Sequence, residues 1–519
     1  MKQYNFDVGI HYIGNVDKYG EHYLDALTIN EKDKVKWVQQ GNSEDGYTYD
    51  RYVIGQGEDT KVFYARANKR ISDVKDAFSD LKDREAVDKY LELAKRANIT
   101  LGISFGGRWM NAWIGWLLFK IGKWMFSDVW AKSVDQVFSK VFAHNRLLQM
   151  NLSAIIGDVG GIRRNVAFSM MTGVNQHYDG GGFYPKGGPN NITCALIPTI
   201  EKSGGCCFAG TPVKEVIFDD GRAIGVVIEV NEKEYEIRCR EGVISAAGVR
   251  NTYTKFAPLE KIAPLVPRWY VDGIHKVLDR CPPSVQHFQI FIGMGKPQSE
   301  LKLPSYNTWF LGFDSKTDQQ RYDYDAMLEQ FHQNPTQGPL FAFVGFPSAK
   351  DPDFATKHPG KSSCVIVTEI PYDYFKKYEY LACGSRGEEY DSLKKKIGMR
   401  LVEELIYKNW PQVRDSVEKI KFGTPLTSKH YLGSPNGESY GLHVNVDRFY
   451  DFDIAKCLVP KTPIKGFYLC GQDIFTPGWV GGLKGGVVAA ESVLGYHSLP
   501  VMVSGRNLIK DLRKMDGKN

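Results

Sequence analysis

The segment that most constrains the fold lies late in the printed chain, at residues 467–490. An apolar run at 467–470 is typical of a buried strand, and a turn rich in glycine and proline follows it. Gly478, Gly481 and Gly482 then open a run of small residues that should form a helix. Glycines at such a junction leave the backbone bare, and the first helical N–H groups point at whatever binds there. The segment predicts half of a nucleotide-cofactor site, with an ordinary strand–turn–helix connection as the alternative.

Asp473 follows the predicted strand directly. A carboxylate in this place can accept hydrogen bonds from ribityl-type hydroxyls, so we predict a cofactor-binding role for it. The other half of a dinucleotide site would be a strand, a G-x-G-x-x-G turn and a helix. No such run occurs in the sequence. The nearest, at 154–161, has the wrong glycine spacing and precedes Arg163 and Arg164, so we interpret it as a substrate-domain loop.

The bulk properties exclude several classes of protein. A chain of 519 residues is too long for one hydrophobic core, which indicates two or more intertwined domains. A net charge of +6 is small for this length and gives no indication of nucleic-acid binding. The nine cysteines show no metal-ligand spacing, so no metal site is predicted.

The order of predicted elements is clearest between residues 181 and 248. A turn at 182–188 leads into a helix that Asn190 or Asn191 should cap. Three β-rich runs follow at 213–218, 223–230 and 235–239, joined by hairpin signals, and then an apolar strand at 242–248. This order is typical of the later part of a nucleotide-binding sheet. Strand-like runs between 277 and 371 predict a second sheet whose apolar face suits a hydrophobic ligand.

Residues 108–126 hold four of the ten tryptophans. Trp109, Trp113 and Trp116 recur at helical spacing, and the uninterrupted apolar part is too short to span a bilayer. An amphipathic helix in the headgroup region fits this composition, and a buried domain helix is the alternative. The membrane contact is predicted at six residues: Trp109, Trp113, Trp116, Lys120, Lys123 and Trp124.

Five motifs carry a family resemblance: FDVGIHYIG at 6–14, YPKGG at 184–188, FPSAKDP at 346–352, GTPLT at 423–427 and GQDIFT at 471–476. They span nearly the whole chain. The sequence resembles the flavin amine-oxidase-like family of carotenoid and retinoid oxidoreductases, in its retinol saturase branch. The resemblance implies an α/β fold with a Rossmann-type FAD/NAD(P)-binding domain, interleaved with an α+β substrate domain. The first βαβ unit of the family is absent from the sequence, so we expect an N-terminally truncated form or an incomplete gene model.

The expected domain plan follows from these patterns. Residues 1–15 are a remnant of the FAD domain, 16–180 a mostly helical substrate and membrane-contact domain, and 181–260 the FAD-binding domain with its β-meander. Residues 261–435 form the substrate domain with a mixed sheet, 436–495 the C-terminal part of the FAD-binding domain, and 496–519 a basic tail.

The resemblance also implies partners and site residues. It implies FAD, an apolar polyene or retinoid substrate, and peripheral or monotopic attachment to the endoplasmic reticulum membrane. The electron source is open: NAD(P)H is one candidate, and an unknown reductant partner is another. The cofactor-binding set is predicted to be Gly188, Val213, Gly471, Asp473, Gly478, Gly481 and Gly482. Tyr440 and His11 are the candidate catalytic proton donors, with a packing role for each as the alternative.

The predicted activity is therefore reduction of one carbon–carbon double bond of a retinoid-like polyene, of the type that turns all-trans-retinol into 13,14-dihydroretinol. Two alternatives stay open. One is a carotenoid cis–trans isomerase or desaturase of the same family. The other is a cofactor-free lipid-binding protein or an inactive truncated form.

Overall fold

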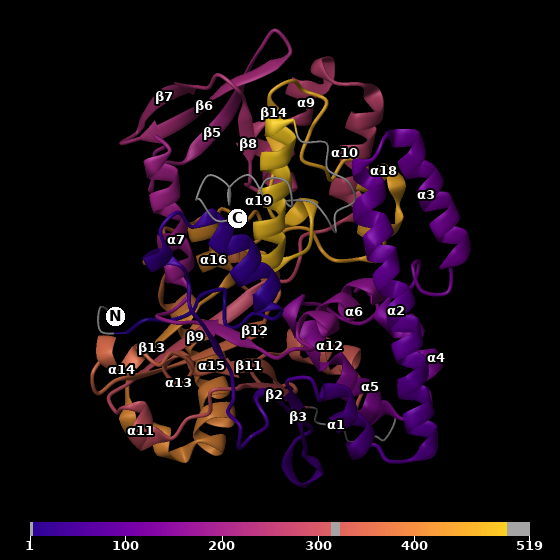
Figure 1. Ribbon diagram of the computed structural model, residues 1–519. Helices are drawn as coiled ribbons and strands as arrows, with labels where there is room; N and C mark the ends of the chain where they lie inside the picture. The colour runs from indigo at the N-terminus through magenta and orange to yellow at the C-terminus, as the bar shows by residue number, and fades with distance from the viewer. Residues whose placement is uncertain (1–3, 313–321, 496–519) are drawn as a thin grey trace.

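The computed structural model describes residues 4–312 and 322–495. A large sheet occupies the lower half of Figure 1, with strand order β13-β9-β12-β11-β10-β2-β3. The strands are β2 (Thr48–Ile54), β3 (Lys61–Arg66), β9 (His287–Met294), β10 (Asn307–Leu311), β11 (Phe341–Gly345), β12 (Ser362–Glu369) and β13 (Val417–Gly423). Neighbouring strands are antiparallel except β2 and β10, which run parallel with Tyr52 opposite Trp309.

Helices bury this sheet. Strands β9 to β12 are almost wholly buried, which explains why they read as apolar runs rather than alternating ones. One continuous apolar core joins the sheet to the helices around it. These helices are α1 (Arg70–Ala77), α2 (Leu81–Trp109), α4 (Val134–Val141), α5 (Arg146–Ser153), α6 (Phe168–His177), α12 (Tyr324–Gln333) and α15 (Glu388–Leu401).

A second unit lies in the upper half of Figure 1 and has its own apolar core. Its parallel pair is β8 (Val243–Ser245) and β14 (Phe467–Leu469), and the meander is β5 (Val213–Asp219), β6 (Arg222–Val230) and β7 (Lys233–Arg238). Its longer helices are α10 (Arg268–Arg280) and α19 (Gly478–Leu494), whereas α7 (Asn190–Lys202) packs in a separate apolar cluster with Leu24 and Val35. The predicted meander, both strands and the glycine-rich helix are confirmed. The predicted asparagine cap is wrong, because Pro189 occupies the cap position and the Asn191 side chain donates to the Lys186 carbonyl at 2.7 Å.

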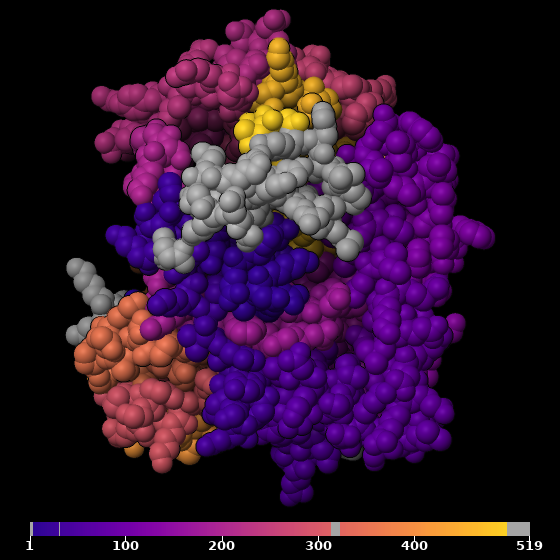
Figure 2. Space-filling model, in the orientation of Figure 1, coloured from indigo at the N-terminus to yellow at the C-terminus, as the bar shows by residue number. Residues whose placement is uncertain are grey.

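The remaining strands and α-helices of the described residues are mostly short. They are β1 (Trp37–Gln39), β4 (Phe183–Pro185), α3 (Ala112–Met125), α8 (Val249–Asn251), α9 (Leu259–Ile262), α11 (Gln298–Leu301), α13 (Pro347–Lys350), α14 (Phe354–Lys357), α16 (Pro425–Leu432), α17 (Val446–Tyr450) and α18 (Phe452–Ala455). The N-terminal segment, indigo in Figure 2, crosses the middle of the visible face. There Tyr23 packs against Val487 of α19.

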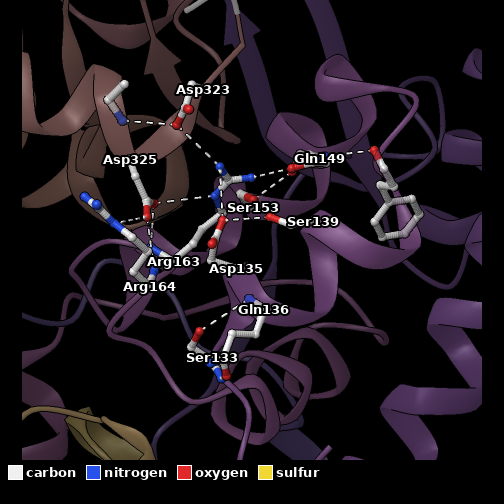
Figure 3. A network of polar contacts seen from close by, with 12 residues as sticks. Ser133, Asp135, Gln136, Ser139, Gln149, Ser153, Arg163, Arg164, Asp323 and Asp325 are labelled. Atoms are coloured by element: carbon white, nitrogen blue, oxygen red, sulfur yellow. Dashed lines mark hydrogen bonds and ion pairs between the residues drawn. The ribbon is translucent and has the colours of Figure 1, made fainter. Parts of the chain in front are cut away.

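The two blocks predicted to form the substrate domain are joined in space. β2 and β3, from residues 16–180, complete the large sheet that residues 261–435 begin. Figure 3 shows a second junction, where Arg163 donates to Gln149 of α5 at 2.8 Å and its backbone N–H donates to Asp325 of α12 at 2.7 Å. The segment at 154–161 was predicted as a loop, but Ala154–Asp158 form a short 3-10 helix, and the segment leads into the contacts that join the two blocks. The predicted basic tail at 496–519 lies outside the described residues.

Candidate functional site

The glycine-rich segment places bare backbone at the ends of two parallel strands. Gly471 follows β14 and Gly248 follows β8, with φ values of +91° and +86° that favour glycine. A Cβ on Gly481 would lie 1.4 Å from the Thr476 carbonyl oxygen, and one on Gly485 would lie 2.4 Å from that of Gly471. Glycine at both positions lets the loop after β14 lie directly on α19.

Gly482 differs from its glycine neighbours. It is exposed, and a Cβ placed there would meet no atom within 4 Å. The backbone at Gly482, one turn into α19, is therefore an uncovered patch, and the loop that follows β14 packs on the same helix. In parallel sheets cofactors bind at the carboxyl ends of the strands, where that loop begins, and helix N–H groups favour phosphate oxygens.

Asp473 lies in the loop between β14 and α19 and joins three segments. Its side chain is buried, Oδ1 accepts from the Leu442 N–H at 2.8 Å, and Oδ2 accepts from the Val249 N–H at 2.7 Å. The carboxylate thus ties the loop after β14 to the start of α8 and to residue 442. Its role toward a ribityl chain stays a prediction, and the structure adds this structural role to it.

The two candidate proton donors lie in one cluster. The Tyr440 ring lies beside Gly478, since a Cβ on that glycine would be 3.9 Å from Tyr440 Cε1. It is also nearly perpendicular to the ring of His287, with centroids 5.8 Å apart. Burial, together with the negative charges of Asp158 and Glu369, raises the pKa of Tyr440 above its ordinary value. The phenol is therefore neutral and keeps its proton.

His11 is near enough to His287 for the charges of the two imidazoles to interact. Its ring packs against Phe343 at 5.1 Å between centroids, and its backbone carbonyl accepts from Lys350 Nζ at 2.9 Å. Burial, helped by the positive charges of Lys350 and His287, lowers the pKa of His11 to about 3. His11 is therefore a neutral imidazole at physiological pH.

Lys350 is the centre of a buried polar network. It contacts Asn307 Oδ1, and Asn307 Nδ2 donates to Asp50 Oδ1 at 2.9 Å. Tyr12 OH lies between two carboxylates, 3.0 Å from Asp50 Oδ2 and 2.8 Å from Asp158 Oδ2. The network extends from β2 and β10 to α13.

Two further contacts bring three of the five sequence motifs together here. Tyr184 OH donates to Asp7 Oδ1 at 2.7 Å, and the Gly187 N–H donates to Asp351 Oδ1 at 2.8 Å. The motifs at 6–14, 184–188 and 346–352 therefore meet at Lys350, although more than 150 residues separate each from the next.

Burial shifts the pKa values of the ionisable groups in this network toward neutral pH. It raises the pKa of Asp50 to about 6, against the hydrogen bonds from Asn307 and Tyr12 and the charge of Lys350. Burial likewise raises the pKa of Asp7 and lowers that of Lys350, and each charge opposes the shift of the other. Groups in this state can hold or move a proton near pH 7.

The other predicted cofactor residues lie in separate places. Gly188 lies in the turn after β4, with φ of +94°, and its N–H donates to the Pro185 carbonyl at 2.9 Å. Val213 begins β5 and pairs with Ile228 of β6. Both roles stay predictions.

Sequence reasoning did not single out Asp50, Asp158, His287, Lys350 or Glu369 as site residues. Lys350 lies in a motif that the resemblance had marked, so a signal was present. Asp50 and His287 lie inside strands and carry no local signal, because only the fold brings them to the cluster.

The tryptophan segment forms two helices rather than one. α2 ends at Trp109, and Asn111 caps α3 by accepting from the Trp113 N–H at 3.3 Å. Gly115, Phe119 and Gly122 face inward; a Cβ on Gly115 would lie 2.1 Å from the Gly107 carbonyl oxygen. The exposed large apolar residues of α3 are Trp113, Trp116, Leu117, Ile121, Trp124 and Met125.

Of the six residues predicted to contact a membrane, four are exposed in the structure and two pack against other side chains. Trp113, Trp116, Lys120 and Trp124 are exposed, and Trp124 is the most open, at 82 %. Trp109 instead packs inward against Phe475, and Lys123 lies over the Tyr450 ring at 3.9 Å. The exposed set is a continuous outer face of α3.

Within residues 4–312 and 322–495, no helix has both the length and the apolar character of a membrane span.

Comparison with solved structures shows which proteins share this fold. An oxidoreductase from Methanosarcina mazei aligns with 94 % of this chain and 87 % of its own, with a TM-score of 0.53 and 14 % identity. Cyclohexylamine oxidase from Brevibacterium oxydans aligns with 98 % of this chain and 88 % of its own, with a TM-score of 0.51 and 12 % identity. The chain has the mixed α/β fold of amine-oxidase-like oxidoreductases.

Sequence comparison gives a narrower result. No family model matches. All-trans-retinol 13,14-reductase of Danio rerio is 29 % identical over 95 % of this chain and 78 % of its own, and that of Homo sapiens is 29 % identical over 99 % and 80 %. Prolycopene isomerase of Arabidopsis thaliana is 23 % identical over 62 % of this chain and 47 % of its own. The chain is thus similar to all-trans-retinol 13,14-reductases along almost its whole length, and to a carotenoid isomerase over a shorter part.

Proposed function

We propose that this protein uses FAD to reduce one carbon–carbon double bond of a retinoid-like polyene. The observation that carries the proposal is the similarity to all-trans-retinol 13,14-reductases along almost the whole chain. The amine-oxidase-like fold supports a redox reaction, and the apolar large sheet supports a hydrophobic substrate.

The residues present fit the flat end of a flavin. Gly482 leaves an uncovered patch of backbone, and Gly471 and Gly478, in the loop after β14 and at the start of α19, are nearly free of close neighbours as well. We propose that these glycines, with Asp473 supporting the loop before α19, hold the ring and ribityl end. The printed sequence contains no strand–G-x-G-x-x-G–helix unit, so the residues for the pyrophosphate end are not identified in it.

A bound, reduced flavin would supply the hydride for one carbon of the double bond. The chain itself must orient the polyene, exclude water and place a proton at the neighbouring carbon. Tyr440 is the better placed donor, because it lies beside Gly478 and keeps its proton. His11 is neutral, and Lys350 binds its backbone carbonyl rather than its ring. Either NAD(P)H or a separate reductant partner would re-reduce the flavin.

The test is product mass under anaerobic conditions. Purified protein is supplied with FAD, chemically reduced, and given all-trans-retinol; we expect a product heavier by two hydrogens. Tyr440→Phe should slow product formation by 10²-fold or more at unchanged flavin content, the range for losing a general acid. Tyr431→Phe, at an exposed ring nearby in sequence, is the matched control.

A second candidate is polyene isomerisation, favoured by the similarity to prolycopene isomerase over 62 % of the chain. Isomerisation adds no hydrogen. A product of unchanged mass but altered retention would therefore replace the reductase proposal with this one.

We also propose that the outer face of α3 contacts a membrane surface, that of the endoplasmic reticulum, peripherally. Its exposed tryptophans and Lys120 match the headgroup region, where indole rings and ammonium groups are both favoured.

Replacing Trp113, Trp116 and Trp124 with Ser should release the protein from anionic liposomes in a pelleting assay. Replacing the exposed Tyr235, Ile237 and Tyr380 with Ser is the control and should leave pelleting unchanged. Continued pelleting of the tryptophan variant would show that another surface binds lipid.

A further inference from the structure

The hydroxyl of Tyr12 has one proton and two carboxyl neighbours. Tyr12 OH lies 2.8 Å from Asp158 Oδ2 and 3.0 Å from Asp50 Oδ2, so both contacts have the length of a hydrogen bond. A phenol has a single proton to donate, although its oxygen can also accept a hydrogen bond. If both carboxyls were ionised, two like charges would share that one proton in a buried place, and their repulsion opposes this. One of the two carboxyls therefore carries a proton and donates it to the phenol oxygen.

The hydrogen bonds of the two carboxyls identify Asp158 as the protonated one. Asp50 Oδ1 accepts a second hydrogen bond, from Asn307 Nδ2 at 2.9 Å, and this bond stabilises the charged form of Asp50. Among the described residues, Tyr12 is the one side-chain partner of Asp158. Burial and the negative charge of Asp50 raise the pKa of Asp158 well above its ordinary value. The hydrogen bond with Tyr12 and the charge of Lys350 oppose this shift without cancelling it.

Asp158 is also the carboxyl of this pair that solvent can reach. It is half-buried, whereas Asp50 is 0 % and Lys350 3 % exposed. Tyr178, whose ring stacks on that of Tyr12 with centroids 4.6 Å apart, is a further titratable group here, and burial raises its pKa so that it stays neutral. A proton that leaves Asp158 can therefore be replaced from water more readily than one that leaves the fully buried groups.

Packing brings the segment that carries Asp158 against the segment that carries Tyr440. A Cβ on Gly160 would lie 2.1 Å from Val285 Cγ2, so the turn after Asp158 packs directly on Val285. The Val285 carbonyl accepts from the N–H of Ser439, the residue before Tyr440, at 3.1 Å. The negative charge of Asp158 accordingly helps to raise the pKa of Tyr440, and both residues are half-buried. The carboxyl and the candidate proton donor are therefore close together and both accessible to water.

We propose that Asp158 holds a proton that it donates to Tyr12 in the resting protein, and that it gives this proton to Tyr440 after Tyr440 has protonated the substrate. In the second step the O–H bond of Asp158 breaks as the O–H bond of Tyr440 forms, and no electron is transferred. The Asp158 carboxylate then takes its next proton from water. The transfer to Tyr440 rests on the proposed function, whereas the resting proton on Asp158 does not.

Infrared difference spectroscopy at pH 7, on the full chain without flavin, tests the resting proton. Asparagine has the shape and charge of a protonated aspartic acid, so Asp158→Asn should remove one carboxylic-acid carbonyl band and leave the carboxylate bands unchanged. The exposed Asp373→Asn is the control and should remove a carboxylate band instead. Tyr12→Phe should shift the acid band to the frequency of a carboxyl without a hydrogen bond, and it serves if Asp158→Asn does not fold. Loss of a carboxylate band in Asp158→Asn, or an unshifted acid band in Tyr12→Phe, would overturn the inference.

Reduction of all-trans-retinol by the FAD-loaded protein under excess chemical reductant tests the transfer to Tyr440. Because Tyr440 starts with its own proton, the first turnover of Asp158→Asn should be as fast as that of the unaltered chain. Later turnovers should be at least tenfold slower, since the local acid is gone. Equal rates in later turnovers would overturn the transfer step and leave the proposed function standing. Failure of the unaltered chain to reduce retinol would contradict the proposed function, and the infrared result would still decide whether Asp158 holds a proton.

Discussion

The buried carboxylate of Asp473 and those of Asp7 and Asp50 have different kinds of partners. Asp473, in the loop before α19, has both oxygens occupied by backbone N–H groups. Asp7 and Asp50 lie against Lys350 at the large sheet, and Asp7 Oδ2 has no partner. The first carboxylate fixes loops in place. The second set sits where burial brings its ionisation toward neutral pH, which is the condition for proton chemistry.

This difference indicates that the two units have different roles, one in binding a cofactor and the other in binding a substrate. The α19 unit offers backbone, held by glycine packing, and this suits a cofactor that needs a rigid cradle. The large sheet offers titratable side chains and apolar walls, and this suits a hydrophobic substrate that needs a proton. Three predictions test this division, beginning with the largest expected effect.

Lys350→Met should cause the largest loss. It removes the cation that balances Asp7 and Asp50, and breaking one partner of a buried charge set costs about 3–5 kcal/mol. Urea unfolding measures the loss. Lys395→Met, at an exposed position of α15, should change stability by less than about 0.5 kcal/mol.

A double variant tests whether the stability loss in Lys350→Met comes from the unbalanced carboxylates. Adding Asp7→Asn to Lys350→Met removes one uncompensated carboxylate, so the double variant should be more stable than Lys350→Met alone. Purely additive losses would show that the two groups do not interact.

Asp473→Ala should have the next largest effect, about 2–4 kcal/mol, because it strands two buried N–H donors. Asp473→Asn keeps one acceptor and should lose about half as much. Thermal unfolding measures both, with the exposed Asp373→Ala as control. If both variants of Asp473 retain full stability, its structural role is wrong.

A change at Glu369 should have the smallest effect on stability. One of its oxygens is bound, as both are in Asp473, and the other is not, as in Asp7: Oε1 accepts from the Gly161 N–H at 3.1 Å, and Oε2 has no hydrogen-bond partner. Burial raises its pKa from 4.5 to about 7. Between these pH values the folded protein keeps a proton that the unfolded chain has lost, so stability should fall as pH rises through this window.

Glu369→Gln should flatten that part of the stability profile, by at most about 3 kcal/mol between pH 4.5 and 7. The exposed Glu85→Gln should leave the profile unchanged. Parallel profiles for Glu369→Gln and the unaltered protein would show that this carboxyl ionises normally.

The sequence predicted the first region well and the second poorly, for physical reasons. β14, α19 and the β5–β7 meander arise from local patterns of apolar residues, turn residues and glycine. The Lys350 network joins residues from β2, β10 and α13 that no local pattern connects. The tryptophan segment lies between these cases: its helical spacing was evident, but the break after Trp109, which turns that ring inward, depends on packing of α3 against α2.

Flavin binding at the start of α19 tests the central claim most directly. Gly482→Leu adds a side chain where no atom of the protein lies within 4 Å, so the fold should be unaffected while the patch is covered. Gly102→Leu, at a similarly open glycine of α2, is the control. In titrations followed by flavin fluorescence, the unaltered chain and Gly102→Leu should bind FAD, and Gly482→Leu should bind at least tenfold more weakly. Equal FAD binding by all three proteins would contradict a flavin site at this helix.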